Sequence, residues 1–266
     1  MSQKKKQAYT EDKIKTLSSL EHIRLRTGMY IGRTGSGAHY DDGIYILVKE
    51  VIDNGIDEFI MGHGERINVS IEEDMVTIRD FGRGIPLGKV VDCVSKINTG
   101  AKYNDDVFQF SVGLNGVGTK AVNALSTYFL VRSHREGEFV EAEFEGGNLV
   151  REEKGETDEP NGTLVSFSPD PAIFKKFAFN PEHLARRLRF YAYLNAKLKI
   201  WFNGELFHCK GGLLDLIADE SQFEKIYPPF HVEDPTLEFA FTHTNRFSEE
   251  YYSFVNGQYT SDGGTH

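Results

Sequence analysis

Three polar residues share one face of a segment with helical spacing and could together carry out phosphate chemistry. Glu50, Asn54 and Asp57 are separated by four and three residues, and these spacings return to the same side of an α-helix. Mg²⁺ keeps several of its waters and takes few protein oxygens, so one amide oxygen and the phosphates of a nucleotide suffice to hold it. A nearby carboxylate is then left to act as a base toward water. A solvated helix face is the plainer alternative, and the stripe alone does not decide between the two.

A glycine-rich stretch, Gly113-Leu-Asn-Gly-Val-Gly118, runs directly into a segment with helical spacing. Successive backbone N–H groups of such a loop can bind phosphate oxygens. The next residues are Thr119 and Lys120, which is the wrong order for a P-loop, and the glycines do not follow the Gly-x-Gly-x-x-Gly dinucleotide fingerprint. The stretch predicts a phosphate loop of another kind, with a simple glycine turn as the alternative.

Asp80 ends a strand-like segment and is followed at once by Gly82 and Gly84. Because glycine lets a flat ring approach the backbone closely, an acceptor at this point could hold the exocyclic amine of a base. An Asp before glycines is also a common turn residue. The sequence contains no HExxH pair and no Gly-x-Ser-x-Gly elbow, so it offers nothing for a zinc hydrolase or a serine triad.

A mixture of helices and strands must position these residues. Apolar spacing predicts helices at 14–27, 41–61, 119–125 and 181–196. Alternation predicts strands at 66–70, 75–80, 128–133, 139–144, 163–167 and 199–202, the first two joined as a hairpin by an acidic turn. A helix followed by hairpins is typical of the α+β class rather than of a doubly wound parallel sheet.

The pattern changes beyond Asp219, where Pro228, Pro229 and Pro235 precede strand-like segments at 237–242 and 251–256. We therefore expect residues 1–13 to form an arm and residues 14–219 to form a first domain. Residues 220–266 are too few to complete a second domain, so we expect that domain either to end early or to continue in a longer parent chain.

Composition excludes several classes of protein. The 266 residues carry 30 Lys and Arg against 40 Asp and Glu, a formal net charge of −10, which argues against a chain that coats nucleic acid with its whole surface. The two cysteines, Cys93 and Cys209, cannot form a disulfide framework or a cysteine zinc site. No apolar run approaches the roughly 18 residues that cross a bilayer, and the start lacks a secretory signal, so a cytoplasmic protein without membrane contact is expected.

Four segments, taken in this order, resemble the signatures of the GHKL ATPases: Glu50-Val-Ile-Asp-Asn54-Gly-Ile-Asp57-Glu58, Asp80-Phe-Gly-Arg-Gly84-Ile-Pro86, Gly113-Leu-Asn-Gly-Val-Gly118 and Gly162-Thr163. The flanking segments 26–32, 98–103, 121–126 and 262–266 are similar to those of the ATP-binding subunit of bacterial type IIA topoisomerases. The resemblance therefore spans nearly the whole chain. Segments 41–47 and 86–91 favour the topoisomerase IV branch, with the gyrase branch as the alternative.

The resemblance implies a two-layer α/β sandwich of the Bergerat type, followed by the start of a transducer domain, with ATP and Mg²⁺ as cofactors. It makes Glu50 the general base that activates water, Asn54 the Mg²⁺ ligand, and Asp80 the acceptor of the adenine amino group, supported by Thr163 through an ordered water. The other residues that the resemblance assigns to the site are Tyr9 of an arm that crosses to a partner protomer, the Glu58 and Arg83 pair, the pocket residues Val51, Ile78, Gly84, Ile85, Pro86 and Val165, the phosphate-lid residues Lys102, Gly113, Leu114, Asn115, Gly116, Val117 and Gly118, and Arg135 at a rim that contacts coumarin-type inhibitors.

The same resemblance implies a nucleotide-operated gate. ATP would favour a homodimer joined through the arm, the dimer would capture duplex DNA, and the A subunit of topoisomerase IV would supply the cleavage chemistry. A non-hydrolytic GHKL dimerisation module is the alternative from another class; the retained Glu50 and the segment Asp262-Gly-Gly-Thr-His266 argue against it.

Three residues depart from the family pattern. Thr27 replaces a usual Pro, Phe81 a frequent Asp, and Asn115 a usual His in the lid. The chain also stops at His266, before the transducer Gln and Lys that reach the γ-phosphate in the family. We therefore expect this chain to bind ATP and to hydrolyse it poorly.

Overall fold

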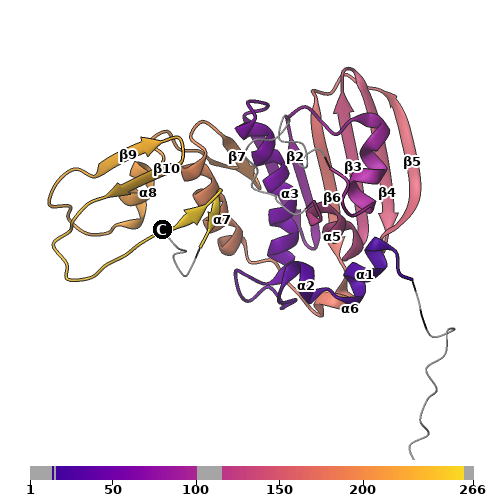
Figure 1. The fold of residues 1–266 in the computed structure, drawn as a ribbon, viewed down its shortest axis with the longest axis horizontal. Helices are drawn as coiled ribbons and strands as arrows, with labels where there is room; N and C mark the ends of the chain where they lie inside the picture. The colour runs from indigo at the N-terminus through magenta and orange to yellow at the C-terminus, as the bar shows by residue number, and fades with distance from the viewer. Residues whose placement is uncertain (1–13, 15, 101–115, 261–266) are drawn as a thin grey trace, which may run out of the picture.

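The fold is built on one large mixed sheet with helices along one of its faces. The computed structural model describes residues 14, 16–100 and 116–260. Eight strands form the large sheet in the order β5-β4-β3-β6-β2-β1-β7-β8, and two small sheets, β9-β10 and β11-β12, lie apart from it (Figure 1). The strands are β1 (Arg66–Glu72), β2 (Met75–Asp80), β3 (Ser126–Arg135), β4 (Glu138–Glu145), β5 (Asn148–Glu156), β6 (Gly162–Pro169), β7 (Lys199–Phe202), β8 (Glu205–Phe207), β9 (Phe230–Asp234), β10 (Leu237–Phe241), β11 (Phe254–Val255) and β12 (Gln258–Tyr259).

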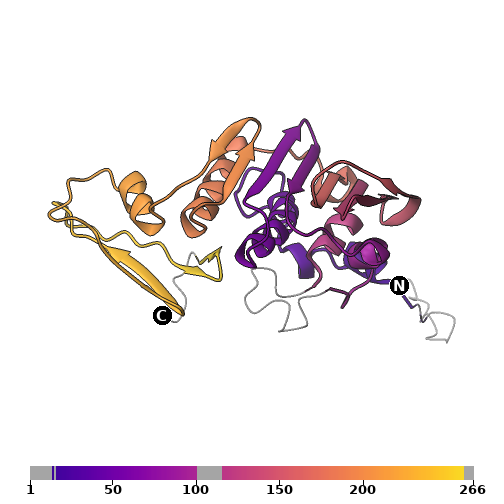
Figure 2. The same ribbon diagram turned by 90° about the horizontal axis from the view of Figure 1, so that it is seen from above.

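The helices form the second layer, which is seen edge-on in Figure 2. They are α1 (Ser19–Leu25), α2 (Gly28–Ile31), α3 (Gly43–Ile60), the 3₁₀ turn η2 (Leu87–Lys89), α4 (Val90–Ser95), α5 (Gly118–Ala124), α6 (Pro171–Phe174), α7 (Pro181–Leu194) and α8 (Leu213–Glu220). Together with β9 and β10, α8 lies at the end of the molecule opposite to β5 (Figure 1).

The register of the sheet confirms the α+β prediction. β1 and β2 form the expected antiparallel hairpin, and its turn contains Glu73 with a positive φ of 57°. β2 pairs antiparallel with β6, which sets Ile78 opposite Val165. Within the described part of this sheet, β1 and β7 are the only parallel neighbours. A sheet of this kind is built mainly from hairpins, so it presents one face to helices and leaves the other without them.

Helix α3 carries the polar stripe because its opposite side is strongly apolar. Residues that recur at helical spacing, including Leu47, Ile52 and Ile56, are fully buried between α3 and the sheet. At the start of the helix the buried Asp42 accepts from Arg33 Nε at 2.8 Å and from the Gly37 N–H at 2.8 Å. These contacts fix the loop that leads into α3, and the helix predicted at 41–61 is confirmed.

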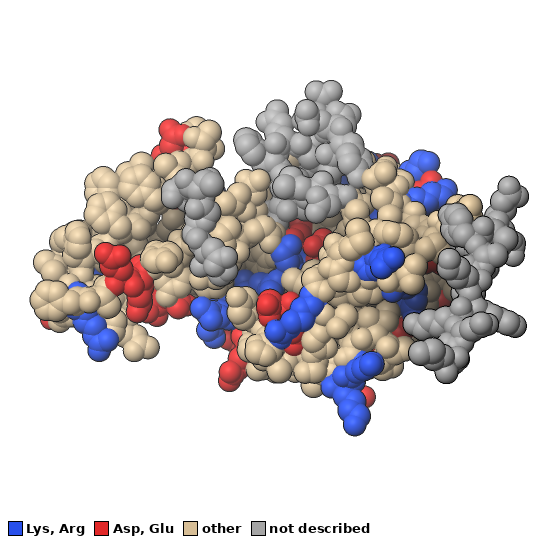
Figure 3. All heavy atoms as spheres, turned by 60° about the horizontal axis from the view of Figure 1, so that its bottom comes forward, with Lys and Arg blue, Asp and Glu red and all other residues tan. Residues whose placement is uncertain are grey.

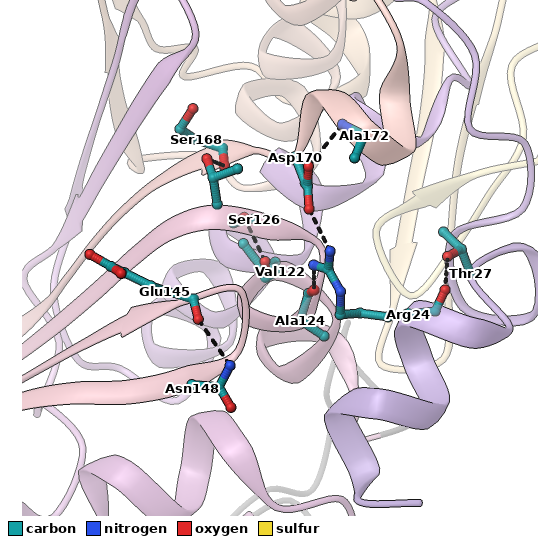
Figure 4. Close-up of polar contacts among 11 residues, drawn as sticks. Arg24, Thr27, Val122, Ala124, Ser126, Glu145, Asn148, Ser168, Asp170 and Ala172 are labelled. Atoms are coloured by element: carbon teal, nitrogen blue, oxygen red, sulfur yellow. Dashed lines mark hydrogen bonds and ion pairs between the residues drawn. The ribbon is translucent and has the colours of Figure 1, made fainter.

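A single arginine links the ends of three helices through hydrogen bonds (Figure 4). Arg24 of α1 donates through Nη1 to the Ala124 carbonyl at 2.6 Å and through Nη2 to Asp170 Oδ2 at 2.5 Å. Ala124 ends α5, while Asp170 caps α6 by accepting from the Ala172 N–H at 2.8 Å. The clamp fixes the C-terminal end of α5, so the start of that helix is held in place toward α3.

Two predicted elements have other bounds than expected, and a long strand was missed. The first helix begins at Ser19, because Ser18 and Glu21 form a reciprocal capping box. The strand at 148–156 was not predicted, because all nine of its residues are exposed and their charges do not alternate with apolar side chains. The strand predicted at 251–256 is reduced to Phe254–Val255, because the preceding Tyr252 packs beside Phe190 of α7.

Charged side chains of both signs are interspersed over the face drawn in Figure 3, and they do not gather there into one basic patch. Among the described residues, no helix is long and apolar enough to cross a membrane.

Candidate functional site

Asp80 lies at the end of β2, where its carboxylate is fixed by the backbone around it. The side chain is buried, and its Oδ1 accepts the Gly82 N–H at 2.9 Å and the Thr163 N–H at 3.2 Å. No hydrogen bond from a described residue reaches Oδ2. Behind the strand end, Arg79 donates to the Asp80 carbonyl at 2.7 Å and to the Pro160 carbonyl at 2.6 Å. The result is a rigid carboxylate with one oxygen left for a ligand.

Burial controls the charge of this carboxylate. Removal from water raises the pKa of Asp80 from its ordinary value of 3.8 to about 6, although the two backbone N–H groups and the nearby Arg79 act in the opposite direction. The group is therefore mostly ionised at neutral pH and ready to accept a proton donor. A shifted carboxyl group at the wall of a glycine-lined site is a functional candidate on physical grounds.

Two glycines let chain segments approach Asp80 more closely than other residues would permit, and a third lets the loop after β2 approach the end of β3. A Cβ at Gly84, which has a φ of +77°, would lie 2.5 Å from the His134 carbonyl oxygen. A Cβ at Gly162, with a φ of +135°, would lie 2.2 Å from the Asp80 carbonyl oxygen. A Cβ at Gly55 of α3 would lie 3.1 Å from the Asp80 Cβ. This glycine-made cradle holds the backbone closely around a buried acceptor, and an acceptor of this kind could take the amine of a flat ring.

The Glu58 and Arg83 pair predicted from the resemblance is present. Arg83 donates through Nη2 to Glu58 Oε1 at 2.9 Å, and its Nε and backbone N–H both reach Oε2, at 3.0 and 2.9 Å. Burial alone would raise the pKa of Glu58, but the three bonds from Arg83 lower it below its ordinary value. The pair joins α3 to the loop after β2 and closes one side of the Asp80 cradle.

Glu50 and Asn54 occupy the adjoining part of α3, two turns and one turn before Glu58, respectively. Asn54 Nδ2 donates to the Glu50 carbonyl at 2.9 Å, which turns the amide oxygen away from that carbonyl. The Glu50 side chain is 26% exposed. A Cβ at Gly118, the first residue of α5, would lie 2.0 Å from Glu50 Oε2. The glycine loop therefore ends directly against the carboxylate that was predicted to be the base.

The alternative that the stripe is merely a solvated helix face is wrong for Asp57, which is 1% exposed.

The remaining predicted residues lie around Asp80 and Glu50. Thr163 donates its own N–H to Asp80, Val165 is buried opposite Ile78, and the Ile85 carbonyl accepts from Ser133 Oγ at 2.7 Å. Arg135 lies at the end of β3 and is half-exposed, with Nε 3.4 Å from Glu136.

Some predicted residues are not placed by the structure. Tyr9, Lys102, Gly113, Leu114 and Asn115 lie outside the described residues. Gly116 and Val117 are described and lead into α5.

Sequence reasoning missed several residues that support the site. Arg79 holds the strand end beneath Asp80, and its guanidinium lies 4.9 Å from the centre of the Phe81 ring. This contact gives a physical reason for Phe81, one of the departures from the family pattern. Ser133 was missed because a serine in an alternating strand carries no signal of its own. Its link to the Ile85 carbonyl appears only when β3 is set beside the loop after β2.

With this geometry established, comparison with known proteins identifies the family. The chain belongs to the histidine kinase-, DNA gyrase B- and HSP90-like ATPases, because the model of that family matches residues 39–172. This range includes α3, Asp80 and the start of α5, so the predicted GHKL fold and family are confirmed.

Within this family, the chain is similar to the B subunits of bacterial type II topoisomerases. The chain is 58% identical to the B subunit of DNA topoisomerase 4 from Borreliella burgdorferi over 263 residues, which cover 98% of this chain and 44% of that protein. It is 38% identical over 290 residues to the B subunit of DNA gyrase from Thermotoga maritima, covering 97% of this chain and 44% of the relative. The chain thus spans less than half the length of these relatives.

A solved structure agrees with this assignment. The fold matches the crystal structure of the 43K ATPase domain of Thermus thermophilus gyrase B in complex with an aminocoumarin, with a TM-score of 0.74 and 31% identity. The match covers 91% of this chain and 67% of that one.

Proposed function

We propose that this chain is the ATP-binding and ATP-hydrolysing region of a type II DNA topoisomerase, of the kind found in the B subunit of topoisomerase IV. The observation that carries the proposal is the buried Asp80 carboxylate in its glycine cradle, with Oδ1 used by the backbone and Oδ2 left for a ligand. An adenine ring offers the flat surface and the exocyclic amine that this site fits. The family match over residues 39–172 supports the same conclusion.

At the adenine end, Asp80 accepts the amino group and Thr163 supports the acceptor. Gly84, Ile85, Pro86 and Val165 line the base, while the Glu58 and Arg83 pair forms the wall beside it. Arg135 stands at the rim. The relative whose title names a bound aminocoumarin is the ATPase domain of a gyrase B, so the same rim is a reasonable place for such an inhibitor to contact this chain.

At the phosphate end, Glu50 takes the proton of the attacking water, and the backbone from Gly116 to Gly118 faces the phosphates. The amide oxygen of Asn54 would hold Mg²⁺ together with phosphate oxygens, because Mg²⁺ keeps several of its waters and takes few protein oxygens. When bound, Mg²⁺ would neutralise phosphate charge. The protein's own contribution is to orient the water and to accept its proton.

The whole-protein role extends beyond this chain. We propose that residues 1–13 form a dimerisation arm carrying Tyr9, that residues 14–219 form the nucleotide domain, and that residues 220–266 begin a transducer domain. Nucleotide binding would favour the homodimer that captures duplex DNA, and the A subunit of topoisomerase IV would cut the DNA. The net charge of −10 and the mixed charges on the face in Figure 3 favour a DNA-binding surface elsewhere in the complete enzyme.

The B subunit of DNA gyrase is the second candidate. The identity of 58% to a topoisomerase IV relative, against 38% to a gyrase relative, favours topoisomerase IV. The complete enzyme distinguishes the two, because gyrase introduces negative supercoils, whereas topoisomerase IV relaxes and decatenates DNA.

Substitution of Glu50 by Gln tests the hydrolytic role against a non-hydrolytic nucleotide switch. In the complete protein, Glu50→Gln is expected to reduce the ATPase kcat by about a thousand-fold, because a positioned base contributes on the order of 10² to 10⁴. Affinity for a non-hydrolysable ATP analogue should remain within about two-fold of the native value, since the amide keeps the shape of the side chain. An unchanged kcat would refute Glu50 as the base.

A further inference from the structure

A second carboxylate on α3 has no role in the proposed hydrolysis. Asp53 lies between Glu50 and Asn54 in the sequence, and its side chain is 1% exposed. A buried carboxylate is costly unless donors surround it. The residues that supply those donors therefore indicate what Asp53 does.

Three donors from three elements converge on Asp53. Lys49 Nζ, one turn earlier on α3, lies 2.6 Å from Oδ2. The Tyr191 hydroxyl of α7 donates to Oδ1 at 2.5 Å, and Gln258 Nε2 of β12 donates to Oδ2 at 3.1 Å. Burial, reinforced by Asp53 itself, raises the pKa of Tyr191 well above its ordinary value, so the hydroxyl remains a donor. The carboxylate is held from both sides.

Aromatic packing fixes the element that carries Gln258. Tyr259, the next residue, stacks on Phe190 with ring centres 5.4 Å apart, and Phe254 of β11 lies 5.5 Å from the same ring. Phe190 and Tyr191 are neighbours on α7, so one side of this helix holds the β11-β12 hairpin while the next residue holds Asp53. The position of Gln258 is therefore set by the same helix.

Lys49 lies between two carboxylates and is held by one of them. Its Nζ is 2.6 Å from Asp53 but 3.6 Å from Glu50 Oε1. An ammonium group in direct contact with Glu50 would occupy an oxygen that has to accept a proton from water. The two distances show that Lys49 is hydrogen-bonded to Asp53, whereas it forms only a longer ion pair with Glu50.

We propose that Asp53 is a positioning residue for hydrolysis, which holds the Lys49 ammonium beside the Glu50 carboxylate and off its proton-accepting oxygens. Tyr191 and Gln258 fix Asp53 in this task, and through Gln258 the arrangement depends on the segment after α8. The inference rests on the proposed function, in which Glu50 is the base.

Removal of the Asp53 charge tests the proposal. In the complete protein, Asp53→Asn is expected to let Lys49 turn onto Glu50 and to lower the ATPase kcat by about ten-fold. The KM for ATP and the affinity for a non-hydrolysable analogue should stay within about two-fold. Addition of Lys49→Met to Asp53→Asn should recover most of the lost kcat, because the competing ammonium is then gone.

A merely structural role for Asp53 predicts something else. The double variant would then be as slow as Asp53→Asn or slower, and that result, or an unchanged kcat in Asp53→Asn, overturns the proposal. Asp42→Asn is the matched control, since Asp42 is equally buried at the start of the same helix and pairs with Arg33. It should lower the unfolding free energy without lowering kcat.

Two further measurements test the same geometry: the first does not use Asp53→Asn, and the second does not depend on its activity. Lys49→Arg keeps Asp53 and the charge, but its planar fork can bridge both carboxylates, so kcat should fall by about five-fold. An unchanged kcat in Lys49→Arg would contradict the proposal. A crystal structure of Asp53→Asn should place Nζ in direct contact with Glu50, and a Lys49 directed elsewhere would also contradict it.

The outcome for Glu50→Gln separates the two levels of the account. If Glu50→Gln hydrolyses ATP normally, the proposed function fails whatever Asp53→Asn does. If Glu50→Gln is inactive and Asp53→Asn is normal, only the role of Asp53 fails.

Discussion

The two ends of the site on α3 are built in different ways. At the Asp80 end, a buried carboxylate is fixed by the N–H groups of Gly82 and Thr163, and two further segments pack against Asp80 at Gly55 and Gly162. At the Glu50 end, the carboxylate is 26% exposed and lies between Lys49 and the start of α5. Backbone contacts fix the carboxylate at the Asp80 end, whereas side chains determine the position of the carboxylate at the Glu50 end.

In the proposed function, this difference separates recognition of the adenine from catalysis of hydrolysis. The adenine end needs no rearrangement to accept a base, because its acceptor is already oriented and desolvated. The phosphate end depends on where one carboxylate points, and a small displacement of that group would affect hydrolysis much more than binding. Substitutions at the two ends should therefore have different kinetic signatures.

Among the substitutions that test this difference between the two ends, Gly118→Ala is expected to have the largest effect on hydrolysis. The added Cβ would lie 2.0 Å from Glu50 Oε2, so the flexible carboxylate has to move. Hydrolysis should fall by roughly 10- to 100-fold, because a displaced base loses much of its contribution. Nucleotide affinity should change little, and Gly28→Ala is a suitable control, since nothing lies within 4 Å of a Cβ there. Equal losses of affinity and of kcat in calorimetry and ATPase assays would contradict the separation.

The affinity for adenosine is expected to depend on pH through the protonation of Asp80. Because Oδ1 of Asp80 accepts two N–H bonds, a proton added below a pH of about 6 has to sit on Oδ2 and would oppose the amine of the base. Affinity for adenosine, which has no phosphate to titrate, should fall by about ten-fold per pH unit below that value. Calorimetry between neutral and mildly acidic pH measures this.

The raised pKa of Asp80 affects folding stability in the opposite direction to adenosine affinity: affinity falls at low pH, whereas the contribution to stability falls at high pH. Since the folded state holds its proton at a higher pH than the unfolded state, the contribution of Asp80 to stability is present below 3.8 and is lost as the pH rises through about 6. Asp80→Asn should remove both pH dependences. An adenosine affinity that is flat in the native chain would contradict the proposed role of Oδ2.

The smallest effect is expected at the wall of the cradle. Arg83→Leu removes the two side-chain hydrogen bonds to Glu58 and keeps the one from the backbone N–H. Both side chains are partly exposed, so the cost should be about 1 kcal/mol in unfolding free energy. Because the pKa of Glu58 is lowered, this stability is present above its ordinary value of 4.5 and is lost as the pH falls below it. Urea titrations at neutral and acidic pH measure the difference, and an equal cost at both would exclude the ion pair as its cause.

Much of the fold could be predicted because helical and alternating patterns are strong in this chain. The apolar side of α3 and the hairpin of β1 and β2 were visible in the sequence. β5 was not, because an exposed strand rich in Glu has no apolar face to reveal it. Its pairing with β4 involves backbone bonds and the ion pairs of Arg151, and neither leaves a periodic signal.

The candidate site was predictable where spacing along one element carries the chemistry. Glu50, Asn54 and Glu58 share α3, and Asp80 precedes its glycines directly in the sequence. The contacts of Asp53 with Tyr191 and Gln258 could not be predicted, since they join residues 138 and 205 positions apart. Arg79 was equally hidden, because its two carbonyl acceptors are defined only once β2 and the loop before β6 are in place.

The most direct test of the central claim is calorimetric titration of a non-hydrolysable ATP analogue into the native chain and into Asp80→Asn. Asp92→Asn is the matched control, since Asp92 is paired with Lys89 and Lys96 on α4. The account predicts saturable binding to the native chain and to the control. Asp80→Asn should bind about 10- to 100-fold more weakly, as expected for loss of one charge-assisted hydrogen bond. Equal affinity of Asp80→Asn and the native chain would contradict adenine recognition by Asp80.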